Sequence, residues 1–206
     1  VSQHGGHYGS TQWSAQETHE IQTSDKYYTW GWGEAENSRL CHMPSAQIES
    51  RAGHPEPLSD GIILWVGMMV PRYAYWMYSA PVGGQTLEYL EEQKIFWEEA
   101  LNKVHSLLVY RMPENDFGWD QKKRLTDLIP SLKLYEGNLS FYKQLKQARL
   151  CINTCNSTPF LETLAVNFPT LIFWNPEHWE LRPSARPFFD ELREVGILHD
   201  SPKSAA

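Results

Sequence analysis

The chain has 206 residues, of which 41% are hydrophobic, and it carries a formal net charge of -7 at pH 7. This apolar fraction supports a folded core and excludes a chain that is disordered throughout. The negative charge argues against binding to a nucleic-acid backbone or to an anionic membrane surface. Three cysteines do not make a disulfide framework, and no apolar run has the length of a transmembrane helix.

Residues 1–60 are polar, aromatic and irregular. We expect one short strand at residues 26–30 and mostly loops elsewhere in this segment, which does not have the pattern of a self-sufficient domain. Near its start, QHGGHYGS combines histidines with glycines, and glycines allow a close approach of the backbone to a ligand. A histidine in such a loop could act as a general base or contact a phosphate. His4 is our candidate, with Gly5, Gly6 and Tyr8 as further residues of the cleft.

The His-x-x-His spacing of this loop raises the question of a metal site. The nearest further ligands in the sequence are Cys41 and His42, and neither completes a convincing set. We therefore predict that the chain binds no metal.

From Gly61 onward, apolar runs that are typical of buried strands alternate with helical patterns. The expected strands are residues 61–70, 105–113, 132–137, 149–155, 170–174 and 197–200. The expected helices are residues 83–104, 120–130, 140–148, 158–167 and 184–196. This alternation predicts an α/β fold, a Rossmann-like and mostly parallel sheet with helices on both faces. Ligands bind such sheets at the carboxyl ends of the strands, here the loops after Val66, Tyr110, Asn153 and Trp174.

The two ends of the chain suggest a piece of a longer protein. The first residue is Val1 and not Met. Near the other end, Ser201 is a natural N-cap and Pro202 suits the first helical position, so a helix is expected to begin where the sequence ends.

The loop Asn156-Ser157-Thr158 follows an expected strand and opens an expected helix. A serine or threonine here could simply cap the helix, or it could bind a phosphate together with the free N–H groups of the first turn. The local pattern leaves both possibilities open. Glu162, near the start of the same helix, could interact with the helix dipole or accept hydrogen bonds from a ribose. Arg111 could bind a phosphate or form a surface ion pair.

Five motifs, in chain order, resemble a family of bacterial transferases of surface-carbohydrate (lipopolysaccharide or capsule-like) biosynthesis. They are QHGGHYG, SDKYYTWGWG, RMPENDFGW, NSTPFLETLAVNFPTLIFWNPEHWELR and VGILHDSPKSAA, and together they span nearly the whole chain. More distantly, the arrangement is similar to GT-B glycosyltransferases, in which two Rossmann-like domains face each other across a cleft. The resemblance implies that residues 61–206 are the nucleotide-sugar-binding C-terminal domain, truncated at both ends. Residues 1–60 would be the tail of the N-terminal domain and the linker, with the missing N-terminal domain as a partner.

The resemblance also implies roles for residues. In bacterial transferases that use CMP-activated acidic sugars, a His-Pro motif and a Ser-Thr motif with a downstream Glu hold the nucleotide. Arg111-Met112-Pro113 and Ser157-Thr158 with Glu162 are similar to these elements. Arginine in place of the histidine leaves UDP, GDP and dTDP donors open.

The implied activity is transfer of a sugar from a nucleotide donor to a bacterial surface glycan or a lipid-linked acceptor. Arg111, Asn156, Ser157, Thr158 and Glu162 would bind the donor nucleotide, and His4 would be catalytic. GT-B enzymes generally need no metal, and we expect no cofactor. The implied location is the cytoplasm, including a peripheral position at the inner membrane, and the isolated fragment would be inactive. Two alternatives stay open, a nucleotide-sugar epimerase on the same fold and a non-catalytic domain in a glycan-assembly complex.

Overall fold

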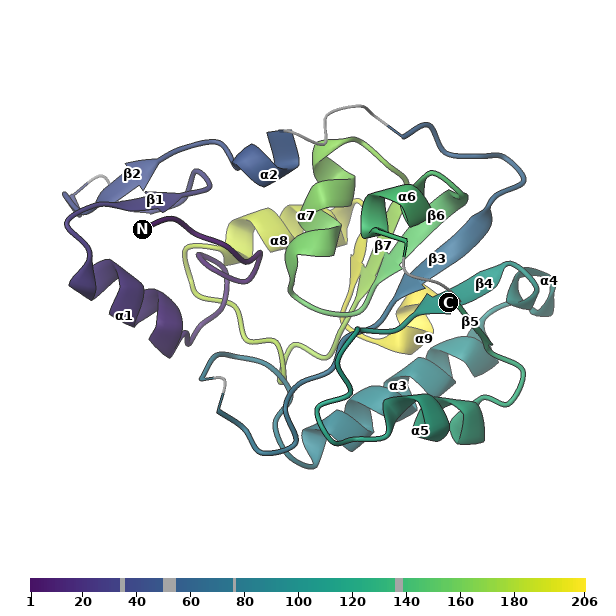
Figure 1. Ribbon diagram of the computed structural model, residues 1–206. Coiled ribbons are helices and arrows are strands. Elements are labelled where there is room, and N and C mark those ends of the chain that lie inside the picture. Colours follow the sequence, from purple (N-terminus) through teal and green to yellow (C-terminus); the bar gives the residue numbers. More distant parts are fainter. Residues whose placement is uncertain (34–35, 50–54, 76, 136–138) are drawn as a thin grey trace.

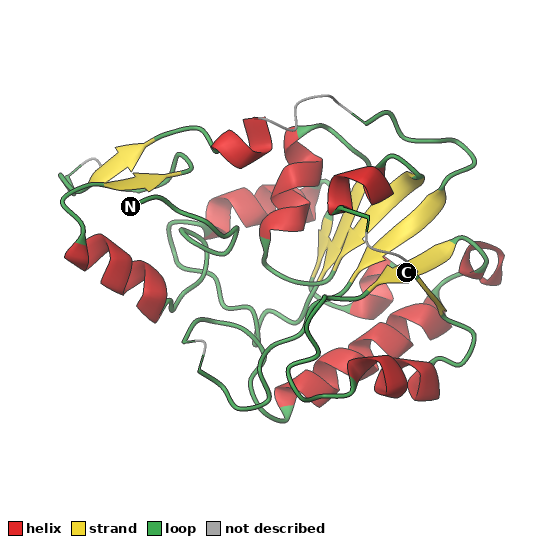
Figure 2. Cartoon of the chain, viewed as in Figure 1, coloured by secondary structure: helices red, strands yellow, loops and turns green. Residues whose placement is uncertain are grey.

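A computed structural model describes residues 1–33, 36–49, 55–75, 77–135 and 139–206. Its centre is a six-stranded parallel sheet with helices on both faces (Figures 1 and 2). The strands are β3 Ile62–Val66, β4 Leu108–Arg111, β5 Lys133–Leu134, β6 Ala148–Asn153, β7 Thr170–Phe173 and β8 Leu198–His199. The α/β, Rossmann-like prediction is therefore confirmed.

The strand order is β5-β4-β3-β6-β7-β8. The chain moves outward from β3 in one direction and then returns to place β6 on the other side of β3. The sheet therefore has a topological switch point between β3 and β6, and in open α/β sheets the ligand crevice lies outside the carboxyl ends of the strands at such a point. The strand ends are aligned there, because Val66 is in register with both Arg111 and Asn153.

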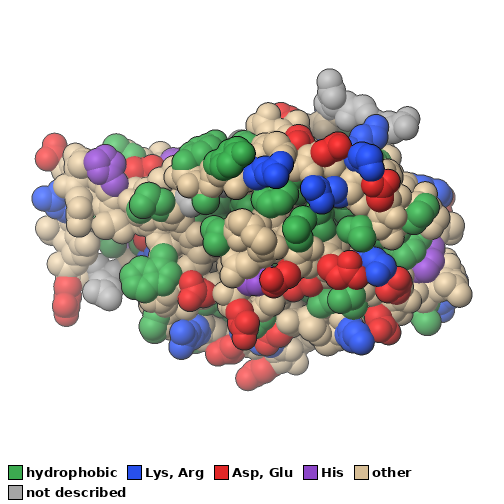
Figure 3. All heavy atoms as spheres, turned by 90° about the horizontal axis from the view of Figure 1, so that it is seen from below, with side chains coloured by type: hydrophobic (Ala, Val, Ile, Leu, Met, Phe, Trp, Pro, Cys, Tyr) green, Lys and Arg blue, Asp and Glu red, His purple; other side chains and the backbone are tan. Residues whose placement is uncertain are grey.

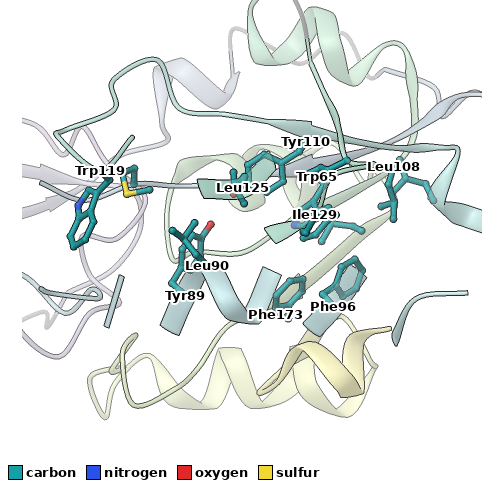
Figure 4. Close-up of a cluster of buried hydrophobic side chains, with 14 residues drawn as sticks. Trp65, Tyr89, Leu90, Phe96, Leu108, Tyr110, Trp119, Leu125, Ile129 and Phe173 are labelled. Atoms are coloured by element: carbon teal, nitrogen blue, oxygen red, sulfur yellow. The ribbon is translucent and has the colours of Figure 1, made fainter. Parts of the chain in front are cut away.

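One face of the sheet is covered by α3 (Gln85–Glu99), α5 (Gln121–Leu128) and α9 (Pro202–Ala205). The core between α3 and the sheet is aromatic: Trp65 packs edge-on against both Phe96 and Tyr110, and Phe96 stacks on Phe173 with ring centroids 4.8 Å apart (Figure 4). The other face carries α6 (Phe141–Leu145), α7 (Thr158–Ala165) and α8 (Arg186–Glu194). Both faces of β3 are thus buried, as its unbroken apolar run predicts.

The expected helix over residues 83–104 is confirmed as far as Glu99, and its continuation as one helix beyond this residue is wrong. The helix α3 ends at Glu99, and a separate short helix, α4, spans Asn102–His105. The ring of His105 stacks on Trp97 at 4.1 Å, and its Nε2 lies 2.8 Å from the Trp97 carbonyl oxygen. The chain folds back because this contact satisfies a carbonyl at the open end of α3.

The expectation of mostly loops in residues 1–60 misses three of the described elements, and the first of them is α1 (Ala15–Thr23). Ser14 is the N-cap residue of α1, and its hydroxyl accepts a hydrogen bond from the Glu17 N–H at 3.3 Å. Ser14 and Glu17 thus have the Ser-x-x-Glu spacing of a capping box. The strand expected at residues 26–30 is confirmed as β1 (Tyr27–Thr29). It pairs with β2 (Leu40–His42) in a separate two-stranded sheet, followed by α2 (Ala46–Glu49).

The amino-terminal segment is docked on the loop that follows β7. Thr11 and Leu181 form an antiparallel bridge, and Arg182 forms an ion pair with the buried Glu17. At the other end of the chain, the Ser201 hydroxyl accepts from the Ser204 N–H at the start of α9, so the predicted cap is confirmed. Among the described residues, no helix combines the length and hydrophobicity that a membrane span requires.

Candidate functional site

At the switch point, a chain of hydrogen bonds through Tyr89 of α3 links the segments that follow β3 and β6. The Met68 N–H donates to the Tyr89 hydroxyl at 2.9 Å, and this hydroxyl lies 2.7 Å from Thr154 Oγ1. Thr154 donates its own hydrogen to the Val66 carbonyl at 2.9 Å. Since that carbonyl can only accept, Tyr89 must donate to Thr154. The direction of the whole chain is therefore fixed, and it joins the carboxyl ends of the two central strands.

Directly after β6, the amino terminus of α7 meets the glycine-rich loop from the start of the chain. Ser157 is the N-cap residue of α7 and has an extended backbone. The Gly6 N–H donates to Thr158 Oγ1 at 3.0 Å. A Cβ on Gly6 would lie 2.6 Å from main-chain atoms of Ser157 and Thr158, so only glycine allows this approach. Ser157 and Thr158 remain partly exposed, and the predicted cleft residue Gly6 does lie against them.

The side chain of Asn156 is hydrogen-bonded to the same amino-terminal loop. Its side chain is buried, its Nδ2 lies 3.0 Å from the Ser10 hydroxyl, and Ser10 also approaches Asn156 Oδ1 at 3.2 Å. The amide is thus directed at the loop of residues 3–10. In the structure Asn156 fixes the loop that Gly6 belongs to, while Ser157 and Thr158 are the partly exposed residues of the motif.

Arg111 lies at the same carboxyl edge but on the far side of β3. It is in register with Val66, which is in register with Asn153, so the three side chains point to the same face of the sheet. Burial raises the pKa of the neighbouring Cys151 thiol to about 12, and its hydrogen bond to Asn153 and the positive charge of Arg111 oppose this rise. The Asn153 Oδ1 atom is buried and has no hydrogen-bond partner among the described residues.

Glu162 is buried in the second turn of α7. It lies beside a small cavity whose wall includes Phe141, Tyr142 and Leu145 of α6. It comes four positions after Thr158 along α7, a rise of about 6 Å. The structure thus brings Gly6, Ser157 and Thr158 together, and it places Arg111 and Glu162 on the same face of the sheet, further from the tip of α7.

His4 belongs to a polar cluster around Glu20 of α1. Its Nε2 lies 3.0 Å from Glu20 Oε1 and 2.9 Å from the Tyr8 hydroxyl. Tyr8 and Tyr27 both donate to the Glu20 carboxylate, and burial, followed by the charge of Glu20, raises the pKa of Tyr8 above its ordinary range. Both hydrogen-bond contacts of His4 with described residues use Nε2, so among these residues its Nδ1 stays available, on an imidazole whose side chain is 64% exposed. A carboxylate that orients an imidazole in this way favours proton acceptance by the free nitrogen.

His7 is a second histidine of this loop that sequence reasoning did not select for the site. Its ring stacks on Tyr78 with centroids 4.4 Å apart and tilts against Tyr8 at 4.5 Å. Burial, followed by the nearby His4, lowers the pKa of His7 to about 4, so it is neutral at physiological pH. Its Nε2 is buried without a hydrogen-bond partner among the described residues. In the sequence, the glycine pair that precedes His7 could have pointed to this residue, because Gly6 contacts the amino terminus of α7 and His7 follows directly.

A cavity of 590 Å³ opens beside the contact between Gly6 and α7. Gly6 and Tyr8 belong to one wall, and Phe160 and Leu161 of α7 belong to another. The guanidinium of Arg182, which also lines it, lies 5.3 Å from the centre of the Trp32 ring. The volume is within the range of pockets for small molecules, and aromatic and apolar walls with few polar groups are typical of them. In the described part of the chain, no three His, Cys, Asp or Glu side chains gather in a way that could hold a metal ion.

Comparison with known proteins gives one match. A family model described as LIC12162 family transferase matches residues 1–206. No curated protein and no solved structure gives a significant match to the chain.

Proposed function

Because the chain belongs to the LIC12162 family of transferases, we propose that it transfers a sugar from a nucleotide-activated donor to a surface glycan or a lipid-linked acceptor. One observation carries this proposal. The glycine-rich loop packs on the amino terminus of α7 at the carboxyl edge of a sheet with the strand order of dinucleotide-binding folds. A helix amino terminus with a threonine hydroxyl is suited to a phosphate, since N–H groups and the helix dipole both favour negative charge.

In this proposal the donor phosphate lies at Ser157 and Thr158. Thr158 Oγ1 accepts from the Gly6 N–H, so the hydrogen of its own hydroxyl is free to donate to a phosphate oxygen. The negative charge of the leaving nucleotide grows as the sugar bond breaks, and these donors stabilise that charge. Arg111 adds a positive charge from β4, on the far side of β3, and Glu162 contacts the ribose. Asn156 contributes by holding the loop through Ser10.

The acceptor is activated by His4. The hydroxyl oxygen of the acceptor forms a bond to the anomeric carbon of the donor sugar, and the bond from that carbon to the donor phosphate breaks. The proton of the acceptor hydroxyl moves to His4. Glu20, 3.0 Å from His4 Nε2, stabilises the imidazolium that results. Gly5 and Tyr8 complete this side of the cleft.

A nucleotide titration with a matched set of variants tests the proposal. CMP, UDP, GDP and dTDP are added to the wild-type protein and to Ser157→Ala, Thr158→Val and Arg111→Gln. We expect one nucleotide to raise the melting temperature of the wild type, because a ligand that binds only the native state stabilises it. The three variants should weaken that rise, whereas Lys122→Gln, an exposed change on α5, should not. If no nucleotide stabilises the wild type, the donor site does not exist.

A further inference from the structure

A second hollow, with a volume of 790 Å³, lies beside the candidate site between the start of α1 and residues 77–82. Backbone hydrogen bonds join its two walls. The Ala15 N–H donates to the Met77 carbonyl at 2.8 Å, and the Ser79 N–H donates to the Trp13 carbonyl at 2.9 Å. We call this hollow the α1 groove. Because backbone hydrogen bonds and the isolated bridge between Ser14 and Tyr78 join its walls, its shape exists before any ligand binds.

The lining of the α1 groove combines an aromatic platform with hydrogen-bonding side chains. Trp13 is 66% exposed even though its backbone is fixed on both sides. Around it stand the carboxylates of Glu177 and Glu180 and the amide of Gln85. None of the described residues that line the groove is a lysine or an arginine. On the underside of the molecule, hydrophobic and acidic side chains lie next to one another (Figure 3).

One wall of the α1 groove packs against the loop of the predicted donor site. Tyr78, in the groove wall, stacks on His7 at 4.4 Å. The residue before His7 is Gly6, which contacts Ser157 and Thr158 at the tip of α7. The wall of the groove is therefore in contact with the loop that reaches the place where the donor phosphate is proposed to lie.

We propose, on the basis of the function proposed above, that the α1 groove binds the acceptor and that this acceptor is a carbohydrate with neutral or amino-bearing sugars and without anionic ones. The apolar face of a sugar ring stacks on an exposed indole, and its hydroxyls are bound by carboxylates and amides. The carboxylates of Glu177 and Glu180, in a chain of net charge -7, repel uronic acids and phosphates. An ammonium group would be attracted both by these carboxylates and by the Trp13 ring.

Calorimetric titration of the protein with three tetrasaccharides tests this assignment. The probes are a glucosamine tetramer, an N-acetylglucosamine tetramer and a galacturonic acid tetramer, which are cationic, neutral and anionic. We expect affinity to fall in that order. Trp13→Ala should weaken the first two by about tenfold, as expected for loss of an aromatic platform. Glu180→Gln should weaken the glucosamine tetramer more than the neutral one.

Tyr73→Ala is the matched control, since Tyr73 is also an exposed aromatic residue, at 84%, but lies outside both the groove and the 590 Å³ cavity. It should leave all three affinities unchanged. The inference is overturned if no tetramer binds, if the anionic tetramer binds as well as the cationic one, or if Trp13→Ala has no effect. Nucleotide titration of the same samples separates the two proposals. Nucleotide binding without sugar binding removes the groove assignment alone, and sugar binding without nucleotide binding removes the proposed function.

Discussion

Gly6 donates its backbone N–H to the hydroxyl of Thr158 at 3.0 Å, across 152 positions of sequence. This contact fixes a glycine-rich loop on the amino terminus of α7, where the chain leaves the central strand β6. It also makes the first residues of the chain part of the candidate site.

Replacing Gly6 tests how much depends on this contact. In Gly6→Ala the new methyl would lie 2.6 Å from main-chain atoms of Ser157 and Thr158, so the loop or the helix terminus must move. We expect a loss of about 1–3 kcal/mol of unfolding free energy, as for other overpacked sites, and a loss of nucleotide binding. Urea denaturation and nucleotide titration measure the two effects.

Gly84→Ala is the control for this change. Gly84 has helical backbone angles and nothing within 4 Å of an added Cβ. The variant should be as stable as the wild type or slightly more stable. Equal stability of the two alanine variants would show that the loop does not pack on α7 as described.

The hydrogen-bond chain through Tyr89 makes a second prediction. In Tyr89→Phe, the partly buried Met68 N–H loses its acceptor and the buried Thr154 hydroxyl loses its donor. The expected cost is about 1–3 kcal/mol of unfolding free energy, the range for a buried polar group left without a partner. Tyr135→Phe, which removes an exposed hydrogen bond to Gln147, should cost much less. Similar costs in urea denaturation would contradict the role given to Tyr89.

The buried carboxylate of Glu17 joins the amino-terminal segment to the loop after β7. It pairs with Arg182 and accepts from the Gly9 N–H at 2.6 Å. Glu17→Ala leaves both groups without their partner, and we expect it to cost about 3 kcal/mol and to speed proteolysis of residues 1–24. In Glu91→Ala, an exposed pair with Lys94 is lost, and stability should barely change. An unchanged proteolysis rate in Glu17→Ala would refute this docking.

His7 makes the stability depend on pH. Its pKa falls from the ordinary 6.5 to about 4 in the folded protein, so the unfolded chain takes up a proton first as the pH falls. The contribution of the neutral His7 to the free energy of unfolding is therefore fully present above pH 6.5 and is lost as the pH falls from about 6.5 to 4. The loss amounts to about 2 kcal/mol after allowance for the partial exposure of the ring. His7→Phe keeps the stacking on Tyr78 and removes the titrating group. The variant should lose less stability than the wild type between pH 7 and pH 4 in urea titrations, and parallel losses would rule out a buried neutral His7.

The sequence is sufficient to predict the sheet, because each strand is an apolar run bounded by a helical pattern, and β3 and β6 are recognisable from that alone. It also predicts the cap of α9 at Ser201. It does not show that Gly6 contacts Thr158 or that Asn156 faces Ser10, since these contacts join opposite ends of the chain. The helix α1 was missed although Ser14 and Glu17 have the spacing of a capping box, because its apolar stripe is weak. The break after Glu99 depends on the stacking of His105 on Trp97, which no periodicity reveals.

The central claim is that a nucleotide phosphate binds where Gly6 meets α7. The most direct measurement is a ¹H–¹⁵N correlation spectrum of the protein, recorded during titration with the nucleotide that raises its melting temperature. Our account predicts that the largest shifts of backbone amides occur at Gly6, Ser157 and Thr158, with smaller ones at Arg111. Largest shifts elsewhere, with these amides unmoved at saturation, would contradict it.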